Sequence, residues 1–262
     1  MRVPVIWLAL VLASSLAGCG LGGDDEPHAK VSPIVESDPG GVPDLAAAER
    51  LIVEGTNAFR QRQGLSAVTR EQRLDQVAQA FADYMARTGN YGHEADGRAP
   101  SDRALAGGYR FCMIAENIGY ALRSAGFSTD GLARLFVEGW ENSPPHRHNM
   151  VEPGAADIGV ALAKADGEQR YFAVQLFGRP DTLKHRFQIA NLSGRPLAYR
   201  IDGRAEQIGD HEAHTHTVCA DVAIEVEGVA GGALRPAGGE RYEIGAAAGG
   251  ETIVTTRRMA GG

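Results

Sequence analysis

Apolar residues recur at steps of three and four positions after residue 43, which places them on one face of a helix. The pattern predicts one helix that follows Asp44 and ends before Gly64, and a second that runs from Thr69 to Gly89. Thr-Arg-Glu-Gln at residues 69–72 has the spacing of a capping box, so we expect the second helix to begin there.

Two more helices are expected, a short one from Ser101 and a longer one from Thr129. After them the period of the apolar residues changes from 3.6 to 2. Alternating apolar residues at 158–162 and 172–176 predict two half-buried strands. The first part of the chain therefore combines helices with strands.

No helical pattern returns beyond residue 180. Short alternating runs, separated by Gly, Ser and Asp, lie at residues 187–189, 197–201, 222–226 and 252–254. Repeated short strands at this spacing predict a small all-β sandwich or barrel. We place a domain boundary near Asp181, so that residues 44–180 form one domain and residues 181–262 form another.

The N-terminus has the pattern of an export signal. Arg2 precedes an apolar run at residues 3–17, which is shorter than the roughly 20 residues of a spanning helix. Leu-Ala-Gly-Cys at residues 16–19 resembles a bacterial lipobox. That resemblance implies that residues 1–18 are a signal peptide that is removed, and that Cys19 carries acyl chains such as palmitate. The alternative is an ordinary signal peptide with an incidental cysteine.

Residues 19–43 are rich in Gly, Pro and acidic residues, and we interpret them as the lipidated cysteine and a disordered tether. The protein is then expected to be held in the cell envelope by its N-terminal lipid. Gly20 after the cysteine resembles the default signal for the outer membrane in double-membraned bacteria.

Composition excludes two classes of protein. The 26 Lys and Arg against 33 Asp and Glu give a net charge of −7, which argues against nucleic acid as a partner. Three cysteines in 262 residues are too few for a disulfide-dense scaffold. With Cys19 assigned to lipid, Cys112 and Cys219 remain, either as one disulfide between the domains or as two buried thiols.

Four segments of the first domain carry polar residues that an ordinary core does not explain. They are Tyr-Gly-His at residues 91–93, Ala-Glu-Asn-Ile-Gly at 115–119, Glu-Gly-Trp at 138–140, and Ser-Pro-Pro-His-Arg-His-Asn-Met at 143–150. Their order, together with Asn57 and Arg60 before them, resembles the CAP superfamily of cysteine-rich secretory, antigen 5 and pathogenesis-related 1 proteins, in its bacterial branch.

The resemblance implies an α+β fold: a CAP-type α-β-α sandwich followed here by the small all-β C-terminal domain. It also implies a cleft that carries His93, Glu116, Glu138 and His146. Two imidazoles with carboxylates suit Zn²⁺ or another divalent ion, so we expect His93 and His146 to face a metal, with Glu116 and Glu138 as hydrogen-bonding partners or water-mediated ligands. The alternative is a satisfied polar network without a ligand.

A catalytic role is permitted but not required by these residues. Ser143, His146 and Glu138 could form a serine-type hydrolase site, and a metal-activated water with Glu116 as base is the other option. No nucleophile-elbow motif is present, and Ser143 before two prolines equally fits a helix-ending turn. The sequence favours a binding protein, whose ligand would be a metal, a small or lipid-like molecule or an envelope component. One alternative is a hydrolase that acts on envelope peptides or polymers, and another is a structural module.

A second histidine cluster lies in the C-terminal domain, at residues 211–216. On a strand, His214 and His216 would point to the same face. They could chelate Cu²⁺ or Zn²⁺, or they could be polar surface residues.

Overall fold

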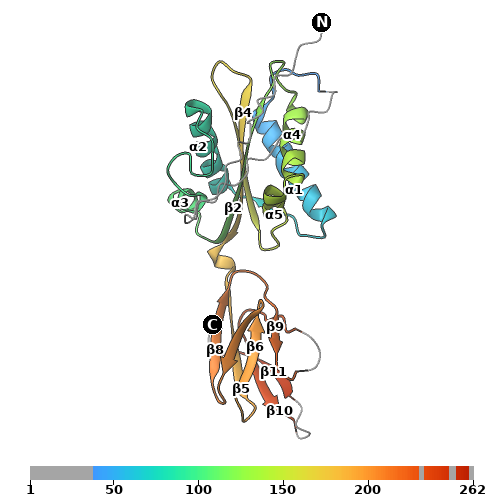
Figure 1. Ribbon diagram of the computed structural model, residues 1–262, viewed down its shortest axis with the longest axis vertical. Helices are drawn as coiled ribbons and strands as arrows, with labels where there is room; N and C mark the ends of the chain where they lie inside the picture. Colours follow the sequence, from blue (N-terminus) through green and yellow to red (C-terminus); the bar gives the residue numbers. More distant parts are fainter. Residues whose placement is uncertain (1–37, 230–232, 248–251, 260–262) are drawn as a thin grey trace, which may run out of the picture.

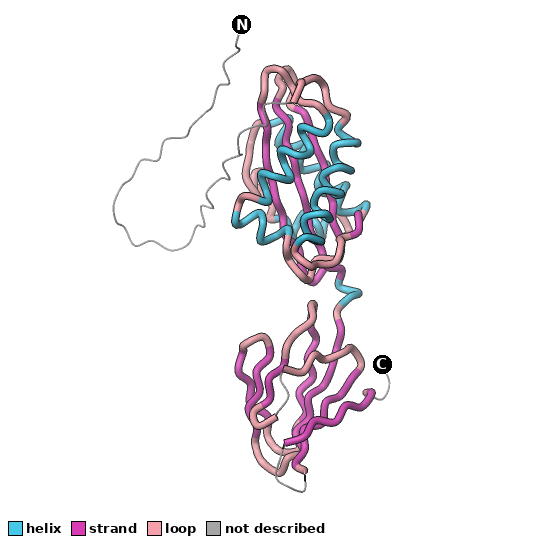
Figure 2. The backbone as a smooth tube through the Cα atoms, turned by 90° about the vertical axis from the view of Figure 1, so that its right-hand side faces the viewer, coloured by secondary structure: helices cyan, strands magenta, loops and turns pink. Residues whose placement is uncertain are grey.

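The computed structural model describes residues 38–229, 233–247 and 252–259. Figure 1 shows two units in tandem, a helix-and-sheet unit and an all-strand unit, with the short 3₁₀ helix η1 (Asp181–Leu183) between them. Figure 2 shows that the helices otherwise belong to the first unit alone. The expected fold class, an α-β-α sandwich followed by an all-β region, is confirmed.

The first unit contains a four-stranded sheet in the order β1-β3-β4-β2. Its strands are β1 (Thr69–Arg70), β2 (Phe111–Leu122), β3 (Asp157–Lys164) and β4 (Arg170–Pro180). Its helices are α1 (Leu45–Arg62), α2 (Gln72–Thr88), α3 (Pro100–Ala106), α4 (Thr129–Glu141) and α5 (Pro144–Met150). Strand β2 lies at one edge of the sheet, and β1 lies at the other.

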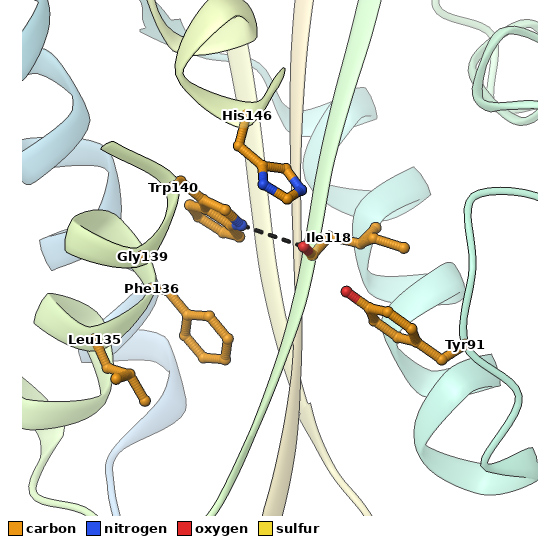
Figure 3. Close-up of a pocket in the computed structure, with 7 residues that line it drawn as sticks. All are labelled: Tyr91, Ile118, Leu135, Phe136, Gly139, Trp140 and His146. Atoms are coloured by element: carbon orange, nitrogen blue, oxygen red, sulfur yellow. Dashed lines mark hydrogen bonds between the residues drawn. The ribbon is translucent and has the colours of Figure 1, made fainter. Parts of the chain in front are cut away.

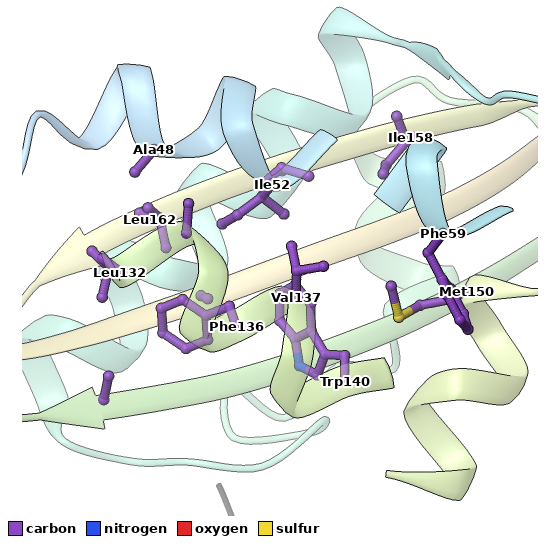
Figure 4. Packing of buried hydrophobic residues seen from close by; sticks show 14 of the residues in the cluster. Ala48, Ile52, Phe59, Leu132, Phe136, Val137, Trp140, Met150, Ile158 and Leu162 are labelled. Atoms are coloured by element: carbon purple, nitrogen blue, oxygen red, sulfur yellow. The ribbon is translucent and has the colours of Figure 1, made fainter. Parts of the chain in front are cut away.

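Helices cover both faces of this sheet. Helices α1, α4 and α5 pack on one face, where Ile52, Phe136 and Trp140 belong to the same buried cluster as Ile158 of β3 (Figure 4). Helices α2 and α3 pack on the other face (Figure 1). The expectation of half-buried strands was therefore wrong, because residues 158–163 of β3 are buried on both sides.

Small residues let α2 approach the sheet closely. The side of β3 that faces α2 presents Gly159, Ala161 and Ala163. A Cβ atom at Gly159 would lie only 2.3 Å from the backbone carbon of Leu74 in α2. The larger apolar residues of β3 point to the opposite face. The alternation in the sequence is therefore between large and small buried side chains, instead of between buried apolar and exposed polar ones.

One local expectation is corrected. Thr69 and Arg70 form β1, which pairs with β3 in parallel, so α2 begins at Gln72 with Glu71 as its N-cap instead of at a capping box. Ser143 lies in the turn that follows the end of α4, where its N–H donates to the carbonyl of Trp140, and it is also the N-cap residue of α5, whose first turn contains the two prolines. The long strand β2 was not predicted, because polar residues interrupt its apolar pattern.

Residues 38–43, expected to be the end of a disordered tether, pack against the first unit. The carboxylate of Asp38 accepts hydrogen bonds from the backbone of Gly40 and Ser128 and pairs with Arg123. Gly41 forms a parallel bridge with Gly126. The signal peptide, Cys19 and the rest of the tether lie outside the described residues.

The second unit is a sandwich of two sheets. The first sheet has the order β11-β10-β5-β8, and the second has the order β7-β6-β9. The strands are β5 (His185–Leu192), β6 (Leu197–Ile201), β7 (Arg204–Ile208), β8 (Ala213–Val218), β9 (Ile224–Val226), β10 (Glu240–Ala246) and β11 (Thr252–Arg258). Phe187, Tyr199 and Tyr242 lie in the core between the sheets.

A covalent bond joins the two units. The Sγ atoms of Cys112, in β2, and Cys219, just after β8, form a disulfide with a Cα–Cα distance of 5.7 Å. Of the two alternatives for these cysteines, the structure has the bridge. Among the residues that the structure describes, no helix combines the length and the apolar character needed to cross a membrane.

Candidate ligand cleft

A cleft lies along the outer edge of β2 (Figure 3). Residues from both sides of this edge strand line it: Tyr91, Ile118, Leu135, Phe136, Gly139, Trp140 and His146. The lining is mostly apolar, with one imidazole and one phenol. A concave apolar site with a few polar groups is the usual form of a small-molecule pocket.

Helix α4 forms one wall of the cleft. Leu135 and Phe136 lie one turn before Gly139 and Trp140, so helical spacing brings all four to the same face. The indole nitrogen of Trp140 donates to the carbonyl of Ile118 at 3.2 Å and fixes the helix against β2. A Cβ atom at Gly139 would meet nothing within 4 Å, so this glycine leaves the cleft open.

His146 is held at the end of the cleft by α5. Its Nδ1 atom is hydrogen-bonded to Ser143 Oγ at 2.9 Å, and both side chains are buried. The backbone carbonyl of His146 accepts from Asn117 of β2 at 3.1 Å. The sequence around the two prolines therefore fixes both the ring and the backbone of this residue.

Tyr91 lies on the opposite side of β2 from His146 (Figure 3). Its ring packs edge-on against Tyr120 at 5.1 Å. Burial, together with the neighbouring Tyr120 and Glu116, raises the pKa of Tyr91 well above its ordinary value. The phenol is therefore neutral at physiological pH, and sequence reasoning did not place it in the cleft.

Glu116 is paired to a buried arginine that sequence reasoning missed. Arg103 of α3 donates to both carboxylate oxygens of Glu116, at 3.0 and 2.8 Å, and the two side chains are 4% and 1% exposed. His93 Nδ1 lies 2.9 Å from the same carboxylate. The structure thus brings His93 and Glu116 together, as the resemblance implied, but adds a permanent positive charge to the pair.

Arg103 binds a second carboxylate as well. Its other terminal nitrogen donates to Asp96 at 2.8 Å, and its guanidinium carbon lies 3.5 Å from the ring centre of Phe81. Burial alone would raise the pKa of Asp96, but the Arg103 charge and the hydrogen bonds from Arg98 and Arg103 outweigh burial and lower it. Nothing in the helical pattern of α3 distinguished Arg103 from a surface arginine.

Of the four residues expected to share the cleft, only His146 lines it; His93 and Glu116 pair with each other outside its lining, and Glu138 lies apart from both. The Glu138 side chain is exposed on α4, and the cleft-lining residues of that helix include Gly139 but not Glu138. The helical turn explains this, because consecutive residues differ in direction by about 100°. The side chain of Glu138 therefore lies outside the lining of this cleft.

A buried polar chain supports the cleft from behind. Asn117 donates to Gln175 at 2.9 Å, Gln175 donates to Thr56 at 2.8 Å, and Asn149 donates to the Asn117 side-chain oxygen at 2.9 Å. Arg60, also buried, donates to backbone carbonyls that include that of Met150. These residues satisfy backbone and side-chain groups, so their role is structural.

The residues fit a metal ion only in part. His93 and His146 each use Nδ1 for a protein hydrogen bond, to Glu116 and Ser143, as metal-bound histidines do. Glu116, however, is already neutralised by Arg103. In the part of the chain that the structure describes, no group of three or more His, Cys, Asp or Glu side chains is arranged to hold a metal.

The residues do not reproduce a serine-hydrolase triad. In that arrangement Nε2 of the histidine faces the serine, while Nδ1 faces a carboxylate. Here Nδ1 of His146 faces Ser143, three residues away in the same helix start, and Glu138 is exposed elsewhere. The Ser143–His146 contact is therefore a local bond at the N-terminus of α5.

Comparison with known proteins covers the first unit. Residues 53–177 match the sequence model of the family described as "CAP: Cysteine-rich secretory protein family". The uncharacterized protein YkwD of Bacillus subtilis (strain 168) is 28% identical over 122 residues, which are 46% of this chain and 44% of that protein.

Solved structures also match part of this chain. An extracellular protein containing an SCP domain from Bacillus anthracis str. Ames has 26% identity and a TM-score of 0.42, over 52% of this chain and 41% of that chain. An outer surface protein of Borrelia burgdorferi has 20% identity and a TM-score of 0.47, over 54% of this chain and 99% of that chain. This chain thus spans less than half the length of the two Bacillus proteins.

Proposed function

The domain at residues 53–177 makes this chain a bacterial member of the CAP superfamily, and from that premise we propose that it is an exported, lipid-anchored binding protein of the cell envelope. Its ligand would be a small molecule with an apolar part, held in the cleft along β2. The observation that carries the proposal is the composition of that cleft: four side chains from α4 and β2 offer only carbon or indole surface, and His146 and Tyr91 supply the polar ends.

Binding is favoured over catalysis by the state of the polar residues. The Glu116 carboxylate is held by Arg103 on both oxygens, so a general base there would first have to leave a buried ion pair. His146 is oriented away from the triad geometry.

Intrinsic fluorescence tests the proposal directly. The chain has two tryptophans, Trp7 and Trp140, and Trp7 lies in the expected signal peptide. The mature protein therefore has one indole, that of Trp140 in the wall of the cleft. We expect titration with dodecanoic acid to change the Trp140 emission and to saturate. Acetate, which lacks the apolar chain, should have no effect at the same concentration.

A cleft-filling variant provides the matched control. Gly139→Leu adds a side chain where nothing lies within 4 Å, and should abolish the dodecanoic acid response without loss of fold. Gly245→Leu makes the same change at an open glycine of the second unit and should leave the response intact. An undiminished response in Gly139→Leu would rule out this cleft as the binding site.

Binding of a divalent ion by His93 and His146 is a second candidate, supported by the anchoring of both Nδ1 atoms. Calorimetric titration of Zn²⁺ into the wild type and into a His93→Ala/His146→Ala double variant tests it. Identical heats for the two proteins would exclude the pair as metal ligands.

The lipid anchor is tested separately. Cys19→Ser removes the acylated thiol, so the variant should move from the membrane fraction to the soluble extracytoplasmic fraction. Wild-type protein that is itself soluble after export would contradict the anchor and leave the binding proposal untouched.

A further inference from the structure

Three side chains at the edge of the C-terminal sandwich converge on one oxygen atom. The hydroxyl of Tyr199 lies 2.9 Å from His214 Nδ1 and 2.9 Å from His216 Nε2. Tyr199 lies on β6, in one sheet, and the two histidines lie on β8, an edge strand of the other sheet. Two imidazoles and a phenol therefore meet across the open side of the sandwich.

The strand period explains why both histidines point inward. In β8, exposed residues alternate with partly buried ones, and His214 and His216 occupy the partly buried positions. The rings lie 6.4 Å apart between centroids. The tyrosine is almost fully buried, whereas the two histidines stay partly open to solvent, so an ion can reach the ring nitrogens.

The donor distances match those of a planar metal site. Neighbouring donors with metal bonds of about 2.0 Å at right angles lie about 2.8 Å apart. The two N···O distances of 2.9 Å are close to this value. A metal could therefore enter between the three donors with small rotations of the rings instead of a rearrangement of the strands.

We propose that Tyr199, His214 and His216 form a binding site for Cu²⁺ in the second unit. Imidazole and phenolate are good ligands for Cu²⁺, which prefers tetragonal geometry and binds such sites more tightly than the other divalent first-row metals. The third donor is a phenol oxygen and not a carboxylate or thiol, which agrees with the finding that no three His, Cys, Asp or Glu residues within the described ranges form a metal group.

The surrounding charge favours a cation. Glu206 of β7 is the cross-strand partner of Tyr199, and its exposed carboxylate interacts electrostatically with both Tyr199 and His216. On binding, Cu²⁺ takes one lone pair from each ring nitrogen and one from the phenol oxygen. The hydroxyl proton passes to solvent, and no electron is transferred.

The experiment is titration of Cu²⁺ into the full-length protein, followed by visible absorption and electron paramagnetic resonance. We expect a one-to-one complex with a phenolate-to-copper charge-transfer band. Tyr199→Phe keeps the ring and should remove the band, while His214→Gln/His216→Gln should weaken this site by more than about tenfold. His211→Gln changes a neighbouring exposed histidine and should behave as the wild type.

Opposite results would overturn the proposal. These are a wild-type protein with no charge-transfer band, a band that survives in Tyr199→Phe, or a double-histidine variant with the wild-type spectrum and affinity. Preferential binding of Zn²⁺ over Cu²⁺ in direct competition would overturn the assignment of the metal. Near-ultraviolet circular dichroism of each variant verifies that the sandwich is folded before titration.

Discussion

A single guanidinium holds together the buried polar group that includes His93 and Glu116. Arg103 joins two carboxylates, those of Glu116 and Asp96, and also donates to the backbone carbonyl of His93. The Arg103 side chain is only 4% exposed, so water does little to stabilise its charge. The guanidinium and the two carboxylates therefore depend on one another for charge balance. The Glu116 carboxylate thus orients His93 and neutralises Arg103, so it is already engaged and is not available as a general base.

Removal of that charge is expected to be costly. Arg103→Met should lower the free energy of unfolding by about 3 to 5 kcal/mol, because two largely buried carboxylates lose their partner. Chemical denaturation measures this value. Arg98→Met is the control: Arg98 also pairs with Asp96 but is 56% exposed, so its loss should cost no more than about 1 kcal/mol.

The lowered pKa of Asp96 predicts a dependence of stability on acid. Its ordinary value is 3.8 and the folded value is lower, so the unfolded chain binds the proton more readily. The stability that Asp96 contributes is fully present above pH 3.8 and is lost as the pH falls through the folded value. Asp96→Asn should flatten this acid limb in a series of melting temperatures; an acid limb of the same slope would contradict it.

At the scale of elements, the contact between α2 and β3 determines the thickness of the first unit. Gly159 allows the backbone of α2 to lie directly on the strand. This feature also explains why periodicity predicted the helices better than the strands. Helices α1, α2 and α4 each bury one face, whereas β3 and β4 are covered on both faces and β2 carries buried polar residues such as Asn117.

A methyl group at this contact should be destabilising. Gly159→Ala places a Cβ atom 2.3 Å from the backbone of Leu74, so we expect a loss of about 1 to 3 kcal/mol or more from overpacking. Gly139→Ala, in open space on α4, should instead stabilise by about 0.5 to 1 kcal/mol. Equal melting temperatures for the two variants would argue against a close α2–β3 contact.

The site could be predicted only in part. The resemblance implied that His93, Glu116 and His146 share one site, and the structure hydrogen-bonds His93 to Glu116 and His146 to Ser143. Glu138 lies on the exposed side of α4, and a short motif does not determine which side of a helix faces the sheet. Arg103 was missed because a buried arginine and an exposed one look the same in a short helix.

On the scale of the whole molecule, two covalent paths connect the units. One is the main chain through η1, and the other is the disulfide between Cys112 and Cys219, which are 107 residues apart in sequence. Two attachment points restrict rotation between bodies more than one does. The second unit is therefore held in a defined orientation to the first.

Removal of the bridge should release this orientation without unfolding either unit. In Cys112→Ser/Cys219→Ser each hydrophobic core is intact, so circular dichroism should stay unchanged. Small-angle X-ray scattering should show a broader distribution of interatomic distances than in the wild type. An unchanged distribution would mean that η1 and its contacts alone hold the units in place.

The two side-chain bonds to the outer edge of β2 also bear on self-association. Trp140 donates to the carbonyl of Ile118, and Asn149 donates to the carbonyl of Glu116. A bare edge strand is a template onto which another chain can add a strand and begin a fibre. With these two acceptors occupied, the longest strand of the sheet is a poor nucleus for aggregation.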